Sequence, residues 1–335
     1  FGGVPLFTES RLTAGDSATL SRATAAEVYS QIEADLQAAI AALPAAKSTD
    51  GRATSFTAHA LLGKVYLYQD KFSEAASILE PLVGLYSLVP DLQNVFLTSG
   101  ENGPESVFEV QHSKNSNWWD WGFPQGSEGS FGIIHHGPRG YNGGVYSSGW
   151  SFNVPTQDLY DAYSDGDSRR DVAILDIVAW AAATGAEYSE GYEHTGYFNH
   201  KYIPRAGSTA SQGELNYENN FRAIRYSDVL LMAAEANNRK TGADDAKAQN
   251  YLNQVRARAF GNASQASTST GATLTQEIWD ERRLEFAMEG HRFFDLVRTG
   301  EAAAKISGFV SGKHEVFPIP QTEIDISGLT QNPGY

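Results

Sequence analysis

The stretch "TSFTAHALLGKVYLYQDKFSEAASILEPLVG", residues 54–84, carries the clearest prediction of fold in this 335-residue chain. Thr54 or Ser55 can cap a first helix, and a second helix is expected to start near Ser73 and to end before Gly84. Small and aromatic residues recur at the spacing of a tetratricopeptide repeat, at Gly63, Tyr66, Ala75 and Leu79. In such a repeat, small residues let two helices approach, and tyrosine fills the space between them. The stretch therefore predicts a packed pair of helices.

Two further segments show a helical pattern. Residues 24–43 have apolar side chains at three- and four-residue steps, and Pro44 stops that helix. A second pair is predicted in "YSDVLLMAAEANNRKTGADDAKAQNYLNQVRARA", residues 226–259. We therefore predict an all-α fold, built on a tetratricopeptide-like helical-pair scaffold that covers residues 22–90 and 222–300.

Residues 91–221 differ from the scaffold. Glycine, asparagine, serine, tyrosine and tryptophan are frequent there, and few segments hold a helical period. "PESVFEVQ" (residues 104–111) predicts a short strand, and "SFNVPTQDLYDAYSDGD" (residues 151–167) predicts one short helix after its proline. Long loops in a compact domain are usually functional. We predict a large, irregular, loop-rich insert that binds the ligand, within a single domain that spans residues 1–335.

Composition narrows the classes of function. Forty acidic residues against twenty-five basic ones give a net charge of -15, which repels phosphate backbones and makes nucleic acid a poor partner. The absence of cysteine excludes disulfides and thiolate catalysis in this stretch. No apolar run is long enough for a transmembrane helix, and no P-loop, GxSxG or GxGxxG motif occurs. We predict no cofactor.

The segment "WDERRLEFAMEGHRFFDLVRTG", residues 279–300, is densely charged. Three glutamates at i, i+4 spacing share one side of a single predicted helix and repel one another unless cations neutralise them: Glu281, Glu285 and Glu289. The arginines available for this are Arg256, Arg258, Arg282 and Arg292. A functional interpretation is a carboxylate pair for glycoside hydrolysis or a metal site. Because no glycine-rich approach lies beside the helix, we favour a buried structural ion-pair network.

This segment also carries a family resemblance. "IWDERRLEFAMEGHRFFDLVRTG" and the terminal "FPIPQTEIDISGLTQNPGY" resemble the C-terminal part of SusD/RagB proteins, the glycan-binding outer-membrane lipoproteins of Bacteroidetes. Further matches follow in family order: "FGGVPL", "VYSQIEADLQAAIAALP", "DGDSRRDVAIL" and "IRYSDVLLMAAEA". The resemblance covers all 335 residues.

The resemblance implies both a fold and a role. The fold is the tetratricopeptide-like one, and the role is non-enzymatic capture of oligosaccharides or polysaccharides at the cell surface. It also implies a SusC-like TonB-dependent transporter as partner. The opening "FGGVPLFTES" has no Met and reads as the middle of a chain. We therefore expect the SusD-like domain to lack its N-terminal part here, including a lipidated anchor to the outer membrane.

Residues 113–153 are the candidate binding surface. Four of the six tryptophans lie there, without a helical or alternating period that would bury them all. Sugar rings stack their C–H faces on aromatic rings, and their hydroxyls need polar partners. We predict aromatic faces from Trp118, Trp119, Trp121, Trp150 and Tyr141. We predict polar contacts from Asn115, Asn117, Asp120, Arg139 and Asn142.

The alternative for this stretch is a small aromatic core beneath the loops. If the stretch does bind a ligand, an anionic glycan is disfavoured, because only Lys114 and Arg139 are basic there. Gluco-configured rings have equatorial hydroxyls and hence broad apolar faces that match several tryptophans. We predict a neutral glucan as the ligand, with a β-1,3-linked chain as first choice.

Two weaker sequence patterns and two other functions compete with this interpretation. His135 and His136 suggest a metal site, but neighbouring histidines rarely chelate one ion, and we predict no metal. "SDGDSRRD", residues 164–171, lacks the glycine and glutamate of a calcium loop and is better explained as a helix-capping salt-bridge cluster. The competing functions are a glycoside hydrolase, using carboxylates beside the aromatic loops, and a tetratricopeptide-type adaptor that binds peptides.

Overall fold

The chain forms two compact units, residues 1–42 with 292–335 and residues 43–291. The computed structural model describes residues 1–8, 11, 13, 15–16, 21–45, 49–115, 128–209 and 216–335. Among these residues, no helix combines the length and the apolar character needed to cross a membrane. Each unit is built from different parts of the predicted scaffold and is described separately.

The helical pair predicted in residues 54–84 is confirmed. Helices α2 (Ser55–Leu67) and α3 (Phe72–Leu79) form it. Thr54 caps α2 through a reciprocal pair of hydrogen bonds, because its hydroxyl accepts from Thr57 N while Thr57 Oγ1 accepts from Thr54 N, each at 3.2 Å. A Cβ on Gly63 would lie 2.4 Å from the side chain of Leu79, so the close approach of the two helices requires glycine there.

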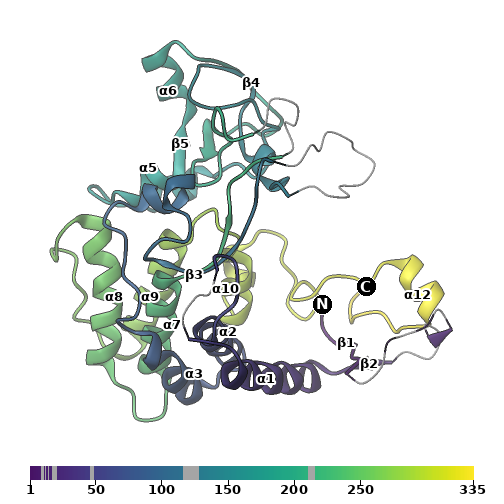
Figure 1. Ribbon diagram of the computed structural model, residues 1–335. Coiled ribbons are helices and arrows are strands. Elements are labelled where there is room, and N and C mark those ends of the chain that lie inside the picture. Colours follow the sequence, from purple (N-terminus) through teal and green to yellow (C-terminus); the bar gives the residue numbers. More distant parts are fainter. Residues whose placement is uncertain are drawn as a thin grey trace. The chain divides into compact units, whose positions relative to one another are not determined.

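The second pair is also confirmed, and a third helix packs with it. Helices α7 (Tyr226–Arg239), α8 (Asp245–Phe260) and α9 (Gly271–Glu285) lie side by side in Figure 1, and α7 also packs on α3. Every residue of α7 from Tyr226 to Asn238 is buried. A helix enclosed on all sides shows no single apolar stripe, and α7 accordingly carries charged and amide side chains into the interior.

The part between the helical pairs consists of short elements, as the composition predicted. The strands among its described residues pair antiparallel: β3 (Ser106–Val110) with β8 (Phe221–Arg225), β4 (Arg139–Asn142) with β6 (Glu187–Ser189), and β5 (Ile174–Asp176) with β7 (Tyr197–Asn199). Its helices are α4 (Gln157–Asp161), α5 (Arg169–Ala173) and α6 (Ile177–Thr184). Its 3₁₀ helices are η3 (Leu92–Phe96), η4 (Thr98–Gly100) and η5 (Gly132–His136). A further 3₁₀ helix, η2 (Glu80–Leu82), directly follows α3.

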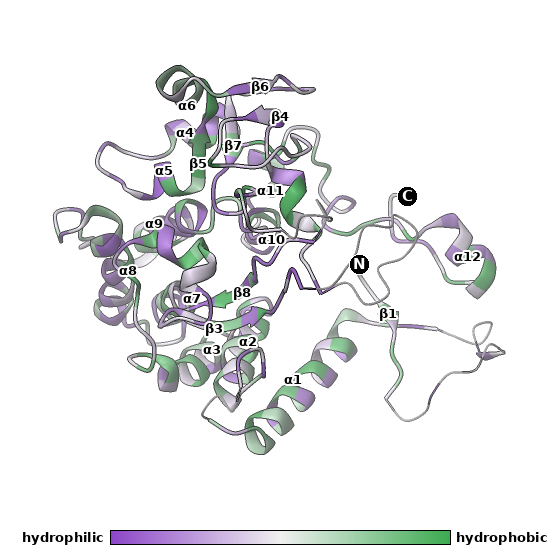
Figure 2. Ribbon diagram, turned by 45° about the horizontal axis from the view of Figure 1, so that its top comes forward, coloured by the Kyte–Doolittle hydropathy of each residue, from purple (hydrophilic) through white to green (hydrophobic). Residues whose placement is uncertain are grey.

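Two of these elements match predictions, and the others, which include α5 and α6, were not predicted. Strand β3 lies where "PESVFEVQ" predicts a strand, and α4 follows Pro155 with Thr156 as its cap. Helix α6, "IVAWAAAT", was not predicted. It is apolar around most of its circumference and coloured mainly as hydrophobic in Figure 2, so it shows no period by which a helix is recognised.

The other unit joins the two ends of the sequence. It contains α1 (Ala25–Ala42), the strand pair β1 (Val4–Pro5) with β2 (Arg22–Ala23), α10 (Arg292–Arg298), α11 (Ala302–Lys305) and α12 (Gln321–Ser327). Helix α1 confirms the helix predicted for residues 24–43. The guanidinium of Arg22 donates to Gly3 O at 2.6 Å and to Thr330 O at 2.7 Å. It thereby ties the opening segment to the terminal one.

The densely charged segment is not one continuous helix. Helix α9 ends at Glu285 with Phe286 as its C-cap, and Met288 adopts a left-handed φ of 66°. The prediction that Glu289 extends the same helical stripe is therefore wrong. The turn nevertheless brings Glu289 beside Glu285, since one guanidinium, that of Arg225, bonds to both.

The prediction of a buried ion-pair network around these glutamates is confirmed. Arg225 lies 3.0 Å from Glu285 and 2.8 Å from Glu289, measured between nitrogen and carboxylate oxygen. Arg258 lies 2.5 Å from Glu285, and Arg169 lies 2.5 Å from Glu281. Burial alone would raise the pKa of Glu285, but the surrounding guanidinium groups outweigh it and hold that pKa far below its usual range.

The partners of the glutamates differ in part from those predicted. Arg256 and Arg258 pair with Glu281 and Glu285 as expected. Arg282 instead pairs with Asp228 at 2.7 Å, and Arg292 belongs to the other compact unit. Three partners were not predicted, because they come from distant parts of the chain: Arg169, Lys201 and Arg225. Arg169 also pairs with Asp167 at 2.7 Å, so "SDGDSRRD" does form a salt-bridge cluster. The N-cap residue of α5, Ser168, makes no side-chain capping hydrogen bond, so the helix-capping part of that expectation is wrong.

Candidate functional site

Four rings form a partly exposed group on the loops of the larger unit, and we call them the aromatic cluster: Phe131, His135, Trp150 and Phe152. Trp150 is the common partner, with ring centroids 5.6 Å from Phe131, 4.9 Å from His135 and 6.3 Å from Phe152. All three rings meet it nearly edge to face, which is a favoured aromatic geometry. Phe131 is 40% exposed and Phe152 is 50% exposed. A group of exposed aromatic rings on loops is typical of a binding surface.

Backbone pairing between two loops positions the cluster. Trp150 N donates to Ile134 O at 2.9 Å, and Phe152 N donates to His135 O at 2.8 Å. Gly149 faces Gly137 so closely that a Cβ on Gly149 would lie 2.5 Å from the Cα of Gly137. The glycines of this stretch therefore let the two loops lie against each other.

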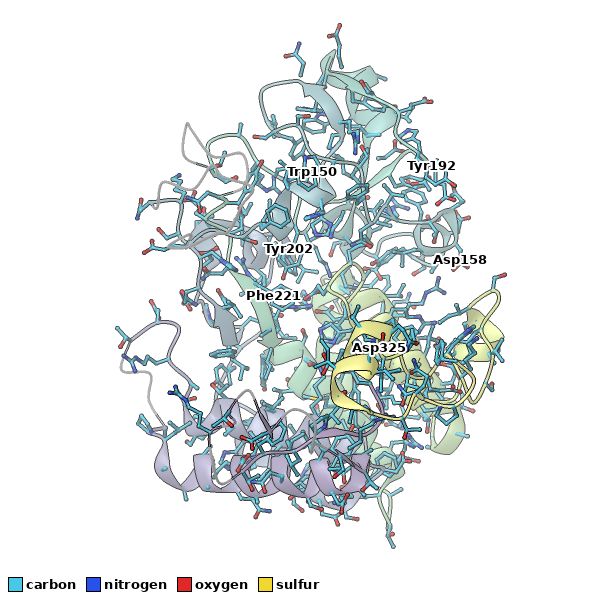
Figure 3. The ribbon with its side chains drawn as sticks, turned by 90° about the vertical axis from the view of Figure 1, so that its right-hand side faces the viewer. Trp150, Asp158, Tyr192, Tyr202, Phe221 and Asp325 are labelled. Atoms are coloured by element: carbon cyan, nitrogen blue, oxygen red, sulfur yellow. The ribbon has the colours of Figure 1, made fainter. Side chains whose placement is uncertain are left out.

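The cluster is supported from below by packed core residues. Trp150 packs against a buried group that includes Ile133, Ile134 and Tyr202. Tyr202 in turn stacks on the exposed Phe221 at 6.0 Å (Figure 3). Trp150 and Tyr202 each pack against neighbouring side chains, and this packing positions the exposed edges of the cluster.

Polar groups border the cluster. Arg139 Nε donates to Trp150 O at 2.8 Å, and its guanidinium carbon lies 5.7 Å from the ring centre of Phe152. Ser151 and Asn153 on either side of Phe152 have left-handed φ values of 59° and 51°. Such strained residues are often found at functional sites, where they aim a neighbouring side chain.

The structure brings together some of the predicted site residues and separates others. Trp150 and Arg139 lie together at the aromatic cluster. Asn142 is exposed at the end of β4, and Asn115 lines a separate pocket. Five of the predicted residues lie outside the described residues: Trp118, Trp119, Trp121, Asn117 and Asp120.

The prediction that Tyr141 presents its ring to a ligand is corrected by the structure. Its ring is buried beside Tyr146 in an apolar core group, and its hydroxyl accepts a hydrogen bond from Trp180 Nε1 at 3.0 Å. It offers no face to a ligand, because neighbouring side chains cover it. The alternative of a small aromatic core beneath the loops is therefore right for this residue, and we leave Tyr141 out of the site.

Three members of the cluster were missed at the level of sequence. Phe131, His135 and Phe152 all lie within residues 113–153, but the prediction weighted tryptophan and tyrosine over phenylalanine. Phe131 directly precedes Gly132, and Phe152 lies two residues after Trp150, but no local pattern in the sequence marks His135. The two neighbouring histidines contact different side chains, and His135 packs against Trp150. His136 packs near Tyr202, and burial lowers its pKa to about 4.

The fold and the cluster together define an all-α protein built on tetratricopeptide-like helical pairs, with an aromatic loop surface. Two family models match the chain. One, described as the SusD family, matches residues 176–315, and the other, described as "Starch-binding associating with outer membrane", matches residues 1–67.

Relatives with solved structures cover nearly the whole chain. A "Laminarin binding SusD-like protein" is 40% identical, with a TM-score of 0.88, over 99% of this chain and 74% of that one. Surface glycan-binding protein A from Bacteroides thetaiotaomicron, solved in complex with laminarihexaose, is 31% identical, with a TM-score of 0.83, over 93% of this chain and 72% of that one. SusD-like protein P2 of Formosa agariphila is 27% identical over 100% of this chain and 70% of its own length. The chain belongs to the SusD family.

Proposed function

We propose that this protein is a non-catalytic glycan-binding protein that captures a neutral glucan on the aromatic cluster. The observation that carries this proposal is the partly exposed group of Phe131, Trp150 and Phe152, held by paired loops and bordered by Arg139. Sugar rings present apolar C–H faces to such side chains. One relative is described as laminarin-binding, and another was solved in complex with laminarihexaose. Both ligands are β-1,3-glucans, which supports a β-1,3-linked chain as the ligand here.

The charges near the site support a neutral ligand. Lys114, one of the two basic residues in the stretch 113–153, is already paired with Glu218 at 3.0 Å. The net charge of the chain is -15. A polyanionic glycan would approach against this field, and Arg139 is the cation that the described residues place at the aromatic cluster.

The positions of the glutamates in the charged segment argue against hydrolysis by that segment. A hydrolase needs two carboxyl groups that flank the glycosidic bond. Glu281, Glu285 and Glu289 are all buried, and each is bonded to basic side chains. In these positions the carboxylates stabilise the fold and have no access to a sugar.

We also propose a cellular setting. The full-length protein is expected to be held at the outer membrane by a lipid anchor and to deliver glucan to a SusC-like TonB-dependent transporter. Support comes from the family description "Starch-binding associating with outer membrane". Co-purification from mildly solubilised outer membranes tests this partnership, and recovery of the full-length protein alone would count against it.

Calorimetric titration with laminarihexaose tests the binding site. Trp150→Ala should weaken binding about tenfold or more, since a stacked ring contributes about 1–2 kcal/mol. Tyr192→Ala is the matched control, because Tyr192 is 88% exposed and lies outside the cluster, and its affinity should equal that of the wild type. Affinity should also change little with salt, because no charge pairing is involved. Equal affinities for Trp150→Ala and the wild type would move the site elsewhere.

An assay for reducing ends tests the hydrolase alternative. The wild-type protein incubated with laminarihexaose should release no new reducing ends. Release at enzymatic rates, abolished by a carboxylate substitution, would overturn the non-catalytic part of the proposal.

A further inference from the structure

A second concave site lies on the same compact unit as the aromatic cluster. It has a volume of about 290 Å³ and is lined by Thr98, Glu101, Glu218 and residues 112–115. We call it the polar pocket. Every side chain that lines it is polar, and none of its described lining residues is Phe, Tyr or Trp. The described lining of the polar pocket can therefore recognise hydroxyl groups but supplies no aromatic ring on which a sugar could stack.

Backbone pairing places the polar pocket close to the aromatic cluster. Ser130 N donates to Tyr217 O at 2.7 Å, and the two residues form an antiparallel bridge. Phe131 of the cluster follows Ser130, and Glu218 of the pocket follows Tyr217. In regular antiparallel geometry, the Cα atoms of Phe131 and Glu218 would be about 8–9 Å apart. A few linked sugar rings span such a distance, so one glycan chain can reach both sites.

The charges of the polar pocket are compensated within the protein. Lys114 Nζ lies 3.0 Å from Glu218 and donates to Gly207 O at 2.8 Å. Glu101 accepts from Asn220 N at 2.8 Å and lies 3.5 Å from Arg222 Nη1. Burial lowers the pKa of His112 below its ordinary value, which favours the neutral imidazole. With each carboxylate already facing a cation, the polar pocket suits an uncharged, hydroxyl-rich ligand.

We propose that the polar pocket binds a terminal glycosyl unit of the glucan whose chain lies on the aromatic cluster. A terminal unit is substituted at one position only, so it presents the most hydroxyls and gains most from a pocket of carboxylate, amide and hydroxyl groups. Units inside the chain instead present their apolar faces to the aromatic cluster. The terminal unit comes from the end of the main chain or from a single-unit branch. This inference rests on the proposed function.

The test fills the pocket and leaves the cluster intact. Thr98→Phe places a ring in the polar pocket from the exposed 3₁₀ helix η4. Ser99→Phe is the matched control, because Ser99 is exposed on the same helix and does not line the pocket. Asn115→Ala is a second variant at an exposed position that removes one amide from the pocket without adding bulk. Melting temperatures confirm that each variant folds.

Each variant is titrated with laminarihexaose and with the same hexasaccharide carrying one β-1,6-linked glucosyl branch. Thr98→Phe should weaken binding of at least one ligand about tenfold, the equivalent of one or two hydrogen bonds. A loss for both ligands assigns the pocket to the chain end, and a loss for the branched ligand alone assigns it to the branch. Ser99→Phe should bind both like the wild type.

Three outcomes overturn the inference, and they are distinguishable. If Thr98→Phe and Asn115→Ala bind both ligands like the wild type while Trp150→Ala does not, the polar pocket is unused and the proposed function stands. If Ser99→Phe weakens binding as much as Thr98→Phe, the effect does not come from the pocket. If the wild type binds neither ligand, the proposed function fails together with the inference.

Discussion

A single carboxylate shows how burial decides what a charged side chain does. Glu285 is fully buried and contacts the guanidinium groups of Arg169, Arg225 and Arg258. Asp158 also forms an ion pair, with Arg283, but its side chain is exposed. Removing the carboxylate of Glu285 would leave buried cations without that partner. Removing the carboxylate of Asp158 would let water solvate Arg283 in its place.

Glu285→Ala should therefore lower the free energy of unfolding by about 3–5 kcal/mol, because it leaves buried arginines unpaired. Asp158→Ala should lower it by about 0–1 kcal/mol, as exposed pairs usually do. Urea unfolding followed by circular dichroism measures both. Glucan affinity of folded Glu285→Ala should equal that of the wild type. A variant of normal stability that no longer binds would mean that Glu285 contacts ligand.

At the scale of elements, the pairing of two loops decides the position of the aromatic cluster. Residues 134–138 and 149–152 are joined by backbone hydrogen bonds, including Gly149 N to Pro138 O at 2.8 Å and Ser151 N to Gly137 O at 2.8 Å. Apart from the 3₁₀ helix η5, which contains residues 134–136, no regular helix or strand covers these described segments. The close approach of Gly137 and Gly149 holds the two segments together, so a side chain at either glycine would separate them and displace Trp150.

Gly149→Ala should weaken glucan binding about tenfold or more while leaving most of the fold intact, because its Cβ would lie 2.5 Å from the Cα of Gly137. Gly132→Ala is the control in the same region, since the nearest atom to its Cβ is 3.9 Å away. Calorimetry with laminarihexaose compares the two variants. Equal affinity of both with the wild type would show that loop pairing does not position the site.

At the scale of the whole molecule, acid sensitivity follows from buried neutral histidines. Burial lowers the pKa of His136 and His200 from 6.5 to about 4. In the unfolded chain, both bind protons near pH 6.5, whereas in the folded protein they do so only near pH 4. The unfolded state therefore binds more protons between these values, and stability decreases as the pH falls through this range.

The free energy of unfolding should accordingly be lower at pH 5 than at pH 7. Paired carboxylates such as Glu285 contribute little to this difference, because their stabilisation is lost only below the ordinary carboxyl pKa of about 4.3. His200→Gln keeps polar atoms near Tyr146 and Asp171 O, the hydrogen-bond partners of His200, and should reduce the decrease. Urea unfolding at the two pH values measures it. An undiminished decrease in this variant would assign the acid sensitivity to other groups.

The helical scaffold follows from local features of the sequence. The cap of α2 is formed by Thr54 and Thr57, three residues apart, and the contact of Gly63 with Leu79 lies within one helical pair. Such features depend on residues close to one another in the sequence. The spacing of apolar residues, the capping residue and the small residue at a contact therefore predict each helix directly. The charged segment was also assigned correctly as structural, because stacked glutamates require buried cations wherever those cations originate.

The tertiary structure alone decided which cations meet these glutamates and which rings join the aromatic cluster. Arg225 reaches Glu285 from β8, and Arg169 reaches Glu281 from α5, across intervals in which no local pattern links the partners. Trp150 and Tyr141 lie in the same aperiodic, glycine-rich stretch, yet Trp150 joins a partly exposed cluster and Tyr141 is buried. The direction of each ring depends on the pairing of distant backbone segments, which side-chain periodicity does not encode. The sequence by itself therefore determined the scaffold, and long-range packing determined the site.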